Sequence, residues 1–155
     1  MNPQRSAHPV LLPLGPSRGL VEALVDEVRA ACRVRGVADC PVTIDVADRH
    51  LPDVDPALLR DILAGLLMQA FANAARPAEE SDAAAVREIV VTSVRLADTV
   101  EIEVADSGPP DPRAHAALEP LALAVGGRLT CAACPDGGRA VTLLLPQRPA
   151  RRQAA

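Results

Sequence analysis

The order of apolar periodicities along the chain is the feature that most constrains its fold. Apolar residues recur with helical spacing at 20–35 and 55–76, and they alternate as in strands at 42–46, 88–96, 99–105, 128–133 and 140–145. A further short helix is predicted at 112–124. This order predicts an α/β two-layer sandwich, with a mixed or antiparallel sheet and the helices on one face.

Residues with strong local preferences mark the ends of these elements. Gly36 is expected to end the first helix. Asp55 is typical of a helix N-cap, and Pro56 suits the first helical position. We expect three regions: a flexible lead-in over 1–18 with a short edge strand at 10–14, one domain over 19–146, and a disordered tail over 147–155.

Composition excludes several classes of function. The chain has 155 residues, enough for one domain, and its net charge of −4 argues against a nucleic-acid partner. It has no Lys, so Schiff-base and P-loop lysine chemistry are excluded, and its only aromatic residue is Phe71. The sequence shows neither a signal peptide nor an apolar run of about 18–20 residues, so we expect a cytoplasmic protein without membrane insertion.

The four cysteines are predicted to be core thiols. Cys131-x-x-Cys134 has the spacing of half a zinc site, but seven residues separate Cys32 from Cys40, which does not supply the other half. The alternation around Cys131 indicates a strand, where Cys packs as a small apolar residue. We therefore predict no zinc, and a metal or redox site is the alternative.

Three segments resemble the GHKL superfamily, which comprises the ATP-binding domains of gyrase, Hsp90, histidine kinases and MutL. Residues 55–70 resemble the N-box helix of the histidine-kinase type. Residues 100–108 resemble the strand that ends in the adenine-binding Asp-x-Gly-x-Gly loop, and 126–146 resemble the C-terminal hairpin. The resemblance covers about residues 10–146 and implies the Bergerat-type ATPase fold of these domains.

The resemblance also implies phosphate and metal contacts on the N-box helix. The family places Asn at two positions four residues apart, and the second holds Mg²⁺; these positions are Gly65 and Gln69 here. The carbonyl oxygen of Gln69 could still bind a hard cation. Asn73, one turn further along, and Arg76 could serve as metal and phosphate contacts. Alternatively, positions 65, 69 and 73 form a small or polar stripe opposite the core face.

Asp106 matches the residue that binds adenine in the family's nucleotide site. The resemblance implies that its carboxylate accepts a hydrogen bond from the adenine amine, and that Gly108 lets the backbone approach the base. Pro110 replaces the second glycine of that motif. Arg139 replaces a Thr that assists adenine recognition in the family. The alternative is an Asp-Ser-Gly-Pro turn without a ligand.

The part of the sequence that would bind the nucleotide phosphates differs more strongly from the family. Only nineteen residues separate Asp106 from Gly126, where the family has a lid and a glycine-rich loop. Gly65 cannot act as the general base of the ATPase branches. The phosphoacceptor His of the kinase branch lies on a dimerisation helix, and the three histidines here, His8, His50 and His115, lie on no such segment.

Two functions from different classes remain. The first is a histidine-kinase-like ATP-binding domain in a two-component or phosphorelay pathway, with a degenerate nucleotide site. The second is a non-catalytic regulatory module of the same fold. Either would have a signalling protein as its partner, such as a response regulator or kinase. If ATP binds, we expect binding to be weak, directed at adenine and nearly independent of Mg²⁺.

Overall fold

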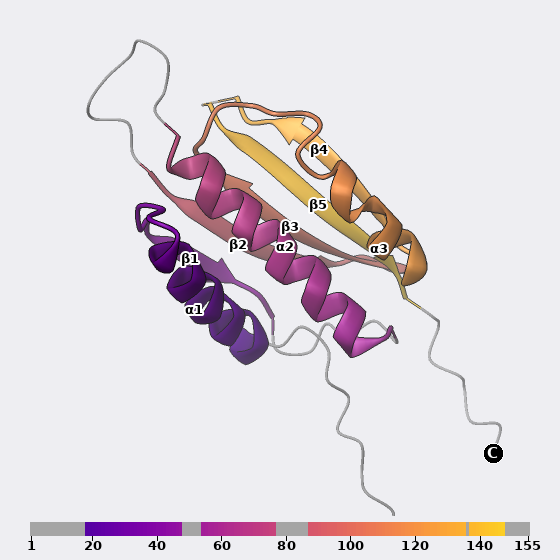
Figure 1. The fold of residues 1–155 in the computed structure, drawn as a ribbon. Helices are drawn as coiled ribbons and strands as arrows, with labels where there is room; N and C mark the ends of the chain where they lie inside the picture. The colour runs from indigo at the N-terminus through magenta and orange to yellow at the C-terminus, as the bar shows by residue number, and fades with distance from the viewer. Residues whose placement is uncertain (1–17, 48–53, 77–86, 136, 148–155) are drawn as a thin grey trace, which may run out of the picture.

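The computed structural model describes residues 18–47, 54–76, 87–135 and 137–147. A five-stranded sheet forms one layer, and the helices lie together on one of its faces (Figure 1). This is the predicted two-layer α/β architecture. The edge strand expected at 10–14 lies outside the described residues, as do most of the lead-in and the tail. In chain order the elements are α1 (Arg18–Val34), β1 (Val42–Asp45), α2 (Pro56–Ala74), β2 (Ile89–Arg95), β3 (Thr99–Asp106), η1 (Ala116–Leu118), α3 (Glu119–Ala124), β4 (Arg128–Ala133) and β5 (Arg139–Pro146).

The sheet is mixed, and its strand order is β1-β2-β3-β5-β4. β1 runs parallel to β2, and the crossover between them contains α2, as a parallel connection requires. The other neighbours are antiparallel. The register between β3 and β5 places Asp106 directly opposite Arg139. This cross-strand pair lies at the centre of the candidate site.

The helix α2 is the central helix of the core. The Asp55 side chain accepts hydrogen bonds from the backbone N–H groups of Ala57 and Leu58, which confirms it as the N-cap. α2 packs against α1 on one side and β3 on another, and Phe71 is completely buried. Although α2 has the length and mean hydropathy of a membrane span, half of its most apolar window is buried inside the protein. Burial in a folded core accounts for its apolar character.

The sheet and α1 supply the remaining core contacts. α1 ends before Gly36, whose φ of 74° is the left-handed conformation expected after a helix. In β3, buried and partly buried residues alternate along the whole strand. Val100, Ile102 and Val104 belong to the buried set, and Asp106 is next in that series. A carboxylate is thereby placed at a core-facing position.

The segment 112–124 differs from the single helix that the sequence predicts. The structure has turns over 112–115, then η1, and then the short helix α3. Pro120 lies at the start of α3 and has no N–H to donate to a preceding turn. A continuous helix through Pro120 would lose that bond, so the segment divides there. The other predicted elements are present, with ends shifted by a few residues.

Candidate functional site

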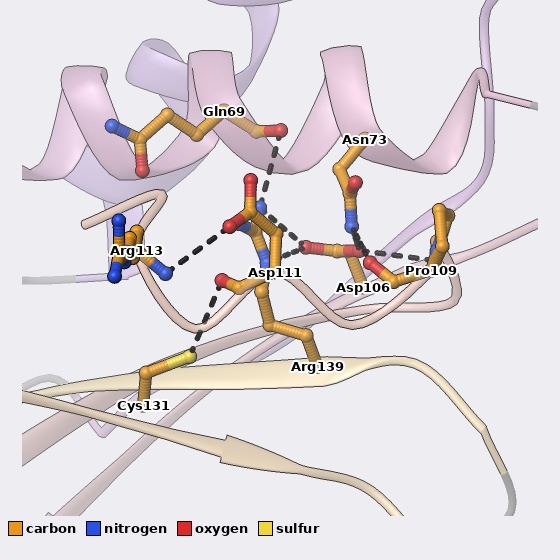
Figure 2. A network of polar contacts seen from close by, with 9 residues as sticks. Gln69, Asn73, Asp106, Pro109, Asp111, Arg113, Cys131 and Arg139 are labelled. Carbon is orange, nitrogen blue, oxygen red and sulfur yellow. Dashed lines mark hydrogen bonds and ion pairs between the residues drawn. The ribbon is translucent and has the colours of Figure 1, made fainter.

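The carboxylate of Asp106 lies between α2 and the sheet and is almost completely buried. Figure 2 shows it at the centre of a polar network that joins α2, the end of β3 and the start of β5. Its oxygen Oδ1 accepts hydrogen bonds from Asn73 Nδ2 at 2.6 Å and from the backbone N–H of Gly108 at 3.0 Å. Both donors therefore hold the same oxygen.

The other oxygen of Asp106 is held by Arg139. The Nε and Nη2 atoms of Arg139 each lie 3.0 Å from Oδ2, and the Arg139 side chain is only 2% exposed. Nη2 also donates to the backbone carbonyl of Gln69 on α2, at 3.4 Å. A carboxylate offers about four acceptor positions, and three hydrogen bonds occupy three of them here, with Arg139 Nη2 as a further ion-pair contact. Both oxygens of Asp106 are thus engaged without a ligand.

Glycine at two positions allows this network to close. A Cβ atom on Gly108 would lie 2.4 Å from the carbonyl oxygen of Asn73. At Gly138, where φ is 96°, a Cβ atom would lie 2.3 Å from the carbonyl oxygen of Asp106. The close approach that Gly108 permits in this structure is therefore between its own loop and α2. Asn73 also donates to the carbonyl of Pro109, at 3.0 Å, which fastens the loop to the helix.

The predicted site residues on α2 lie along one side of a small pocket. Gln69, Asn73 and Arg76 line a cavity of about 190 Å³ together with Ala72, Asp111, Ala114 and Arg139. Two buried polar atoms of lining residues have no hydrogen-bond partner among the described residues, Gln69 Oε1 and Arg139 Nη1. We call this cavity the Gln69–Arg139 pocket. It brings the expected residues Gln69, Asn73 and Arg76 next to the network of Asp106.

Gly65 lies outside the Gln69–Arg139 pocket. A Cβ atom there would lie 2.6 Å from a methyl group of Leu118, so η1 packs directly on this position of α2. The stripe expected at 65, 69 and 73 is consequently not uniform. Its first position contacts apolar side chains, its second lines the pocket, and Asn73 is buried against Asp106.

The prediction of core thiols is confirmed for Cys32 and Cys40, and Cys131 packs against the core, but Cys134 lies outside it. Cys32 and Cys40 are buried, and Cys131 is partly buried in β4, with Cys134 just beyond the strand. Burial raises the pKa of Cys131 above its ordinary value, and the nearby Arg139 charge opposes that shift only in part. No group of three or more His, Cys, Asp or Glu side chains with the geometry of a metal site occurs within the described residues. The absence of zinc stays a prediction.

Sequence reasoning missed two members of the site, Arg139 and Asp111. Arg139 was noted only as a replacement of a family Thr, and the strand was expected to begin at residue 140. Asp111 lies in the segment that replaces the family's lid, and its Oδ1 accepts a hydrogen bond from the backbone N–H of Arg113, at 3.1 Å. The available signal was a single Arg at the start of an otherwise apolar strand.

These residues fit Mg²⁺-ATP poorly. An adenine amine would need a free acceptor on Asp106, and both oxygens are already engaged. A Mg²⁺ ion prefers several oxygen ligands and anionic phosphates. The Gln69–Arg139 pocket offers the carboxylate of Asp111 and the amide oxygen of Gln69, but it places the guanidinium groups of Arg76 and Arg139 beside them.

Comparison with known proteins gives structural matches only. No protein-family model matches the chain, and no curated protein matches it. The catalytic domain of histidine kinase ThkA, in a nucleotide-free form, is 16% identical with a TM-score of 0.59, over 83% of this chain and 95% of that one. The cytoplasmic segment of histidine kinase QseC is 17% identical with a TM-score of 0.62, over 92% and 83%.

A mycobacterial sensor histidine kinase, MprB, gives a third match. It is 19% identical with a TM-score of 0.52, over 83% of this chain and 95% of that one. At such low identity these matches establish the arrangement of elements rather than a shared activity. The chain has the fold of histidine-kinase catalytic domains.

Proposed function

We propose that this chain is a signal-transduction module of histidine-kinase fold that has lost its nucleotide site and acts through contacts with a signalling protein. The observation that carries the proposal is that Arg139, Asn73 and the backbone of Gly108 already engage both oxygens of Asp106. Arg139 supplies the donors that an adenine amine would otherwise supply. The resemblance to histidine kinases supports a partner from a two-component or phosphorelay pathway, such as a response regulator or a kinase.

The electrostatics of the Gln69–Arg139 pocket support the same proposal. The pocket contains one free carboxylate and two guanidinium groups, and one of those guanidinium groups is already neutralised by Asp106. The charges of Arg76, Arg139, Asp106 and Asp111 sum to zero. Such a site gives little net attraction to a triphosphate, whose charge is also screened by water in an open pocket. We place the module in the cytoplasm, because the matching QseC structure is that protein's cytoplasmic segment.

A nucleotide titration tests the proposal. The purified chain is titrated with ATP, ADP and GTP, with and without Mg²⁺, by isothermal titration calorimetry. We expect affinities no tighter than a Kd of about 1 mM, equivalent to about −4.1 kcal/mol. Mg²⁺ should change any adenine-nucleotide affinity by less than about tenfold. Micromolar binding of Mg²⁺-ATP, or transfer of phosphate from ATP to a protein, would contradict the proposal and support an active kinase-like domain.

A variant at Arg139 tests whether this residue is what weakens nucleotide binding. Arg139→Thr introduces the residue that the family has at this position and removes the hydrogen bond and the ion pair that the guanidinium makes with Asp106 Oδ2. Where that variant folds, we expect ATP and ADP to bind at least tenfold more tightly than to the unaltered chain, and GTP to bind no better. Arg60→Thr is the matched control, because Arg60 is an exposed residue of α2 that pairs with Glu27 on α1. Equal affinities in Arg139→Thr and the unaltered chain would remove Arg139 as the cause.

A further inference from the structure

Two buried polar atoms of residues that line the Gln69–Arg139 pocket have no hydrogen-bond partner among the described residues, and they are of opposite hydrogen-bonding type. Arg139 Nη1 can only donate, and Gln69 Oε1 can only accept. Leaving such a group buried and unpaired costs about 1–3 kcal/mol. Native proteins bury few of these atoms, so each one calls for an explanation. Their residues line the pocket, but both atoms are inaccessible to solvent, so a ligand there would reach them only after the Gln69 and Arg139 side chains turn toward it.

The other charged residues of the pocket also include one that can donate to a ligand and one that can accept from it. Arg76 is exposed at the end of α2 and makes no ion pair with a described residue, and Asp111 is half-buried on the facing loop. The pocket therefore offers positive groups, Arg76 and Arg139, for an anion. It also offers the Asp111 carboxylate and Gln69 Oε1 for a cationic donor. A ligand that satisfies both sets must carry both charges.

The volume of the pocket and its apolar lining further limit the size and the side chain of the ligand. A cavity of about 150 Å³ holds a molecule the size of benzene, so 190 Å³ accommodates roughly seven to ten non-hydrogen atoms. The remaining lining residues that carry no polar side chain are Ala72 and Ala114. Their methyl groups leave room for a short apolar substituent. A nucleotide is far larger than this volume.

We propose that the Gln69–Arg139 pocket binds a free α-amino acid with a small side chain. The guanidinium groups of Arg76 and Arg139 receive its carboxylate, which they can hold by charge-assisted hydrogen bonds. Asp111 and Gln69 Oε1 receive its ammonium group. Because the pocket is neutral overall, a neutral zwitterion enters it without adding net charge, whereas a phosphate brings at least one unbalanced negative charge. The inference does not depend on the signalling role proposed above.

The test is an NMR titration of the ¹⁵N-labelled chain with single small ligands. Glycine, L-alanine and L-valine are compared with acetate, which lacks the ammonium group, and with methylammonium, which lacks the carboxylate. Inorganic phosphate serves as the anion probe. We expect amide shifts centred on Ala72, Asn73 and Ala114, and affinities for at least one amino acid at least tenfold tighter than for acetate, methylammonium or phosphate.

Two variants test which pocket residues bind the carboxylate and the ammonium group of the amino acid. Asp111→Asn retains an oxygen for the Arg113 N–H, so the loop keeps its turn while the negative charge is removed. Asp111→Asn and Arg76→Gln should each weaken amino-acid binding at least tenfold, and Arg60→Gln, outside the pocket on the same helix, should leave it unchanged. Phosphate or acetate binding as tightly as every amino acid would overturn the proposal, as would the absence of any shift at 20 mM ligand, a concentration of about ten times a Kd of 2 mM.

Discussion

The buried pair of Asp106 and Arg139 yields a prediction about stability in which the two partners are not equivalent. Asp106→Leu leaves the guanidinium of Arg139 buried, with the carbonyl of Gln69 at 3.4 Å as its remaining hydrogen-bond partner among the described residues. Breaking a buried pair in this way costs about 3–5 kcal/mol. Arg139→Met leaves the Asp106 carboxylate with two donors on Oδ1, Asn73 and the Gly108 N–H. We therefore expect a smaller loss, of about 1–3 kcal/mol.

The double variant Asp106→Leu/Arg139→Met completes a thermodynamic cycle. Because it removes both charges together, it should be more stable than Asp106→Leu alone. The two substitutions should be non-additive by about 0.5–3 kcal/mol. Urea denaturation followed by far-UV circular dichroism measures all four proteins, since the chain has no Trp or Tyr for intrinsic fluorescence.

A surface pair provides the control for this cycle. Arg60 and Glu27 join α2 to α1, and their side chains are 45% and 59% exposed. Arg60→Ala should cost no more than about 1 kcal/mol, since exposed ion pairs contribute little. The reasoning would be refuted if Arg139→Met destabilised the protein more than Asp106→Leu, or if the two changes were additive.

Three further predictions concern the core, the loop and alkaline pH. Leu66 is 2% exposed, so Leu66→Ala should lower the free energy of unfolding by about 2–5 kcal/mol, and a loss below about 1 kcal/mol in urea denaturation would contradict its placement. Gly108→Ala should cost about 1–3 kcal/mol by the same measurement, because its Cβ would overlap the Asn73 carbonyl, and an unchanged midpoint would refute that contact. Burial raises the folded-state pKa of three thiols, those of Cys32, Cys40 and Cys131. Their contribution to stability is complete below the unfolded thiol pKa of about 8.5 and is lost as pH rises toward the folded values. With no Lys or Tyr present, unfolding free energies measured at pH 7.5 and pH 10 should differ mainly through these thiols, and replacing all three by Ala should remove most of the difference.

The fold was predictable because its signals are local. The cap at Asp55 and the turn at Gly36 each depend on a few neighbouring residues, and the structure confirms both. The alternation in β3 depends only on which face of the strand is buried. The helix predicted over 112–124 was wrong in its first part, because Pro120 outweighs the helical spacing of the apolar residues around it.

The arrangement of the site was not predictable in the same way. Arg139 and Asp106 are 33 residues apart in sequence, and only the register of β3 against β5 brings them together. Considered alone, a charged residue at a core-facing position argues against a strand, and the predicted strand began only after Arg139, at residue 140. The pairing with Asp106 removes that objection, because a buried charge is tolerated when it is paired and hydrogen-bonded. Such pairing is a property of the tertiary structure.

The position of Arg139 also links two departures from the family that look separate in the sequence. A carboxylate buried between a helix and a sheet needs donors, and in a nucleotide-binding domain of this fold the resemblance implies that the ligand supplies one of them. Here Arg139, Asn73 and Gly108 supply three hydrogen bonds that engage both oxygens. Asp106 then needs no ligand to be stable, and under the proposed loss of the nucleotide site a lid over phosphates would have no ligand to cover. The short segment between Asp106 and Gly126 fits the same proposal, since its residues pack on α2: Pro109 accepts a hydrogen bond from Asn73, and Leu118 contacts Gly65.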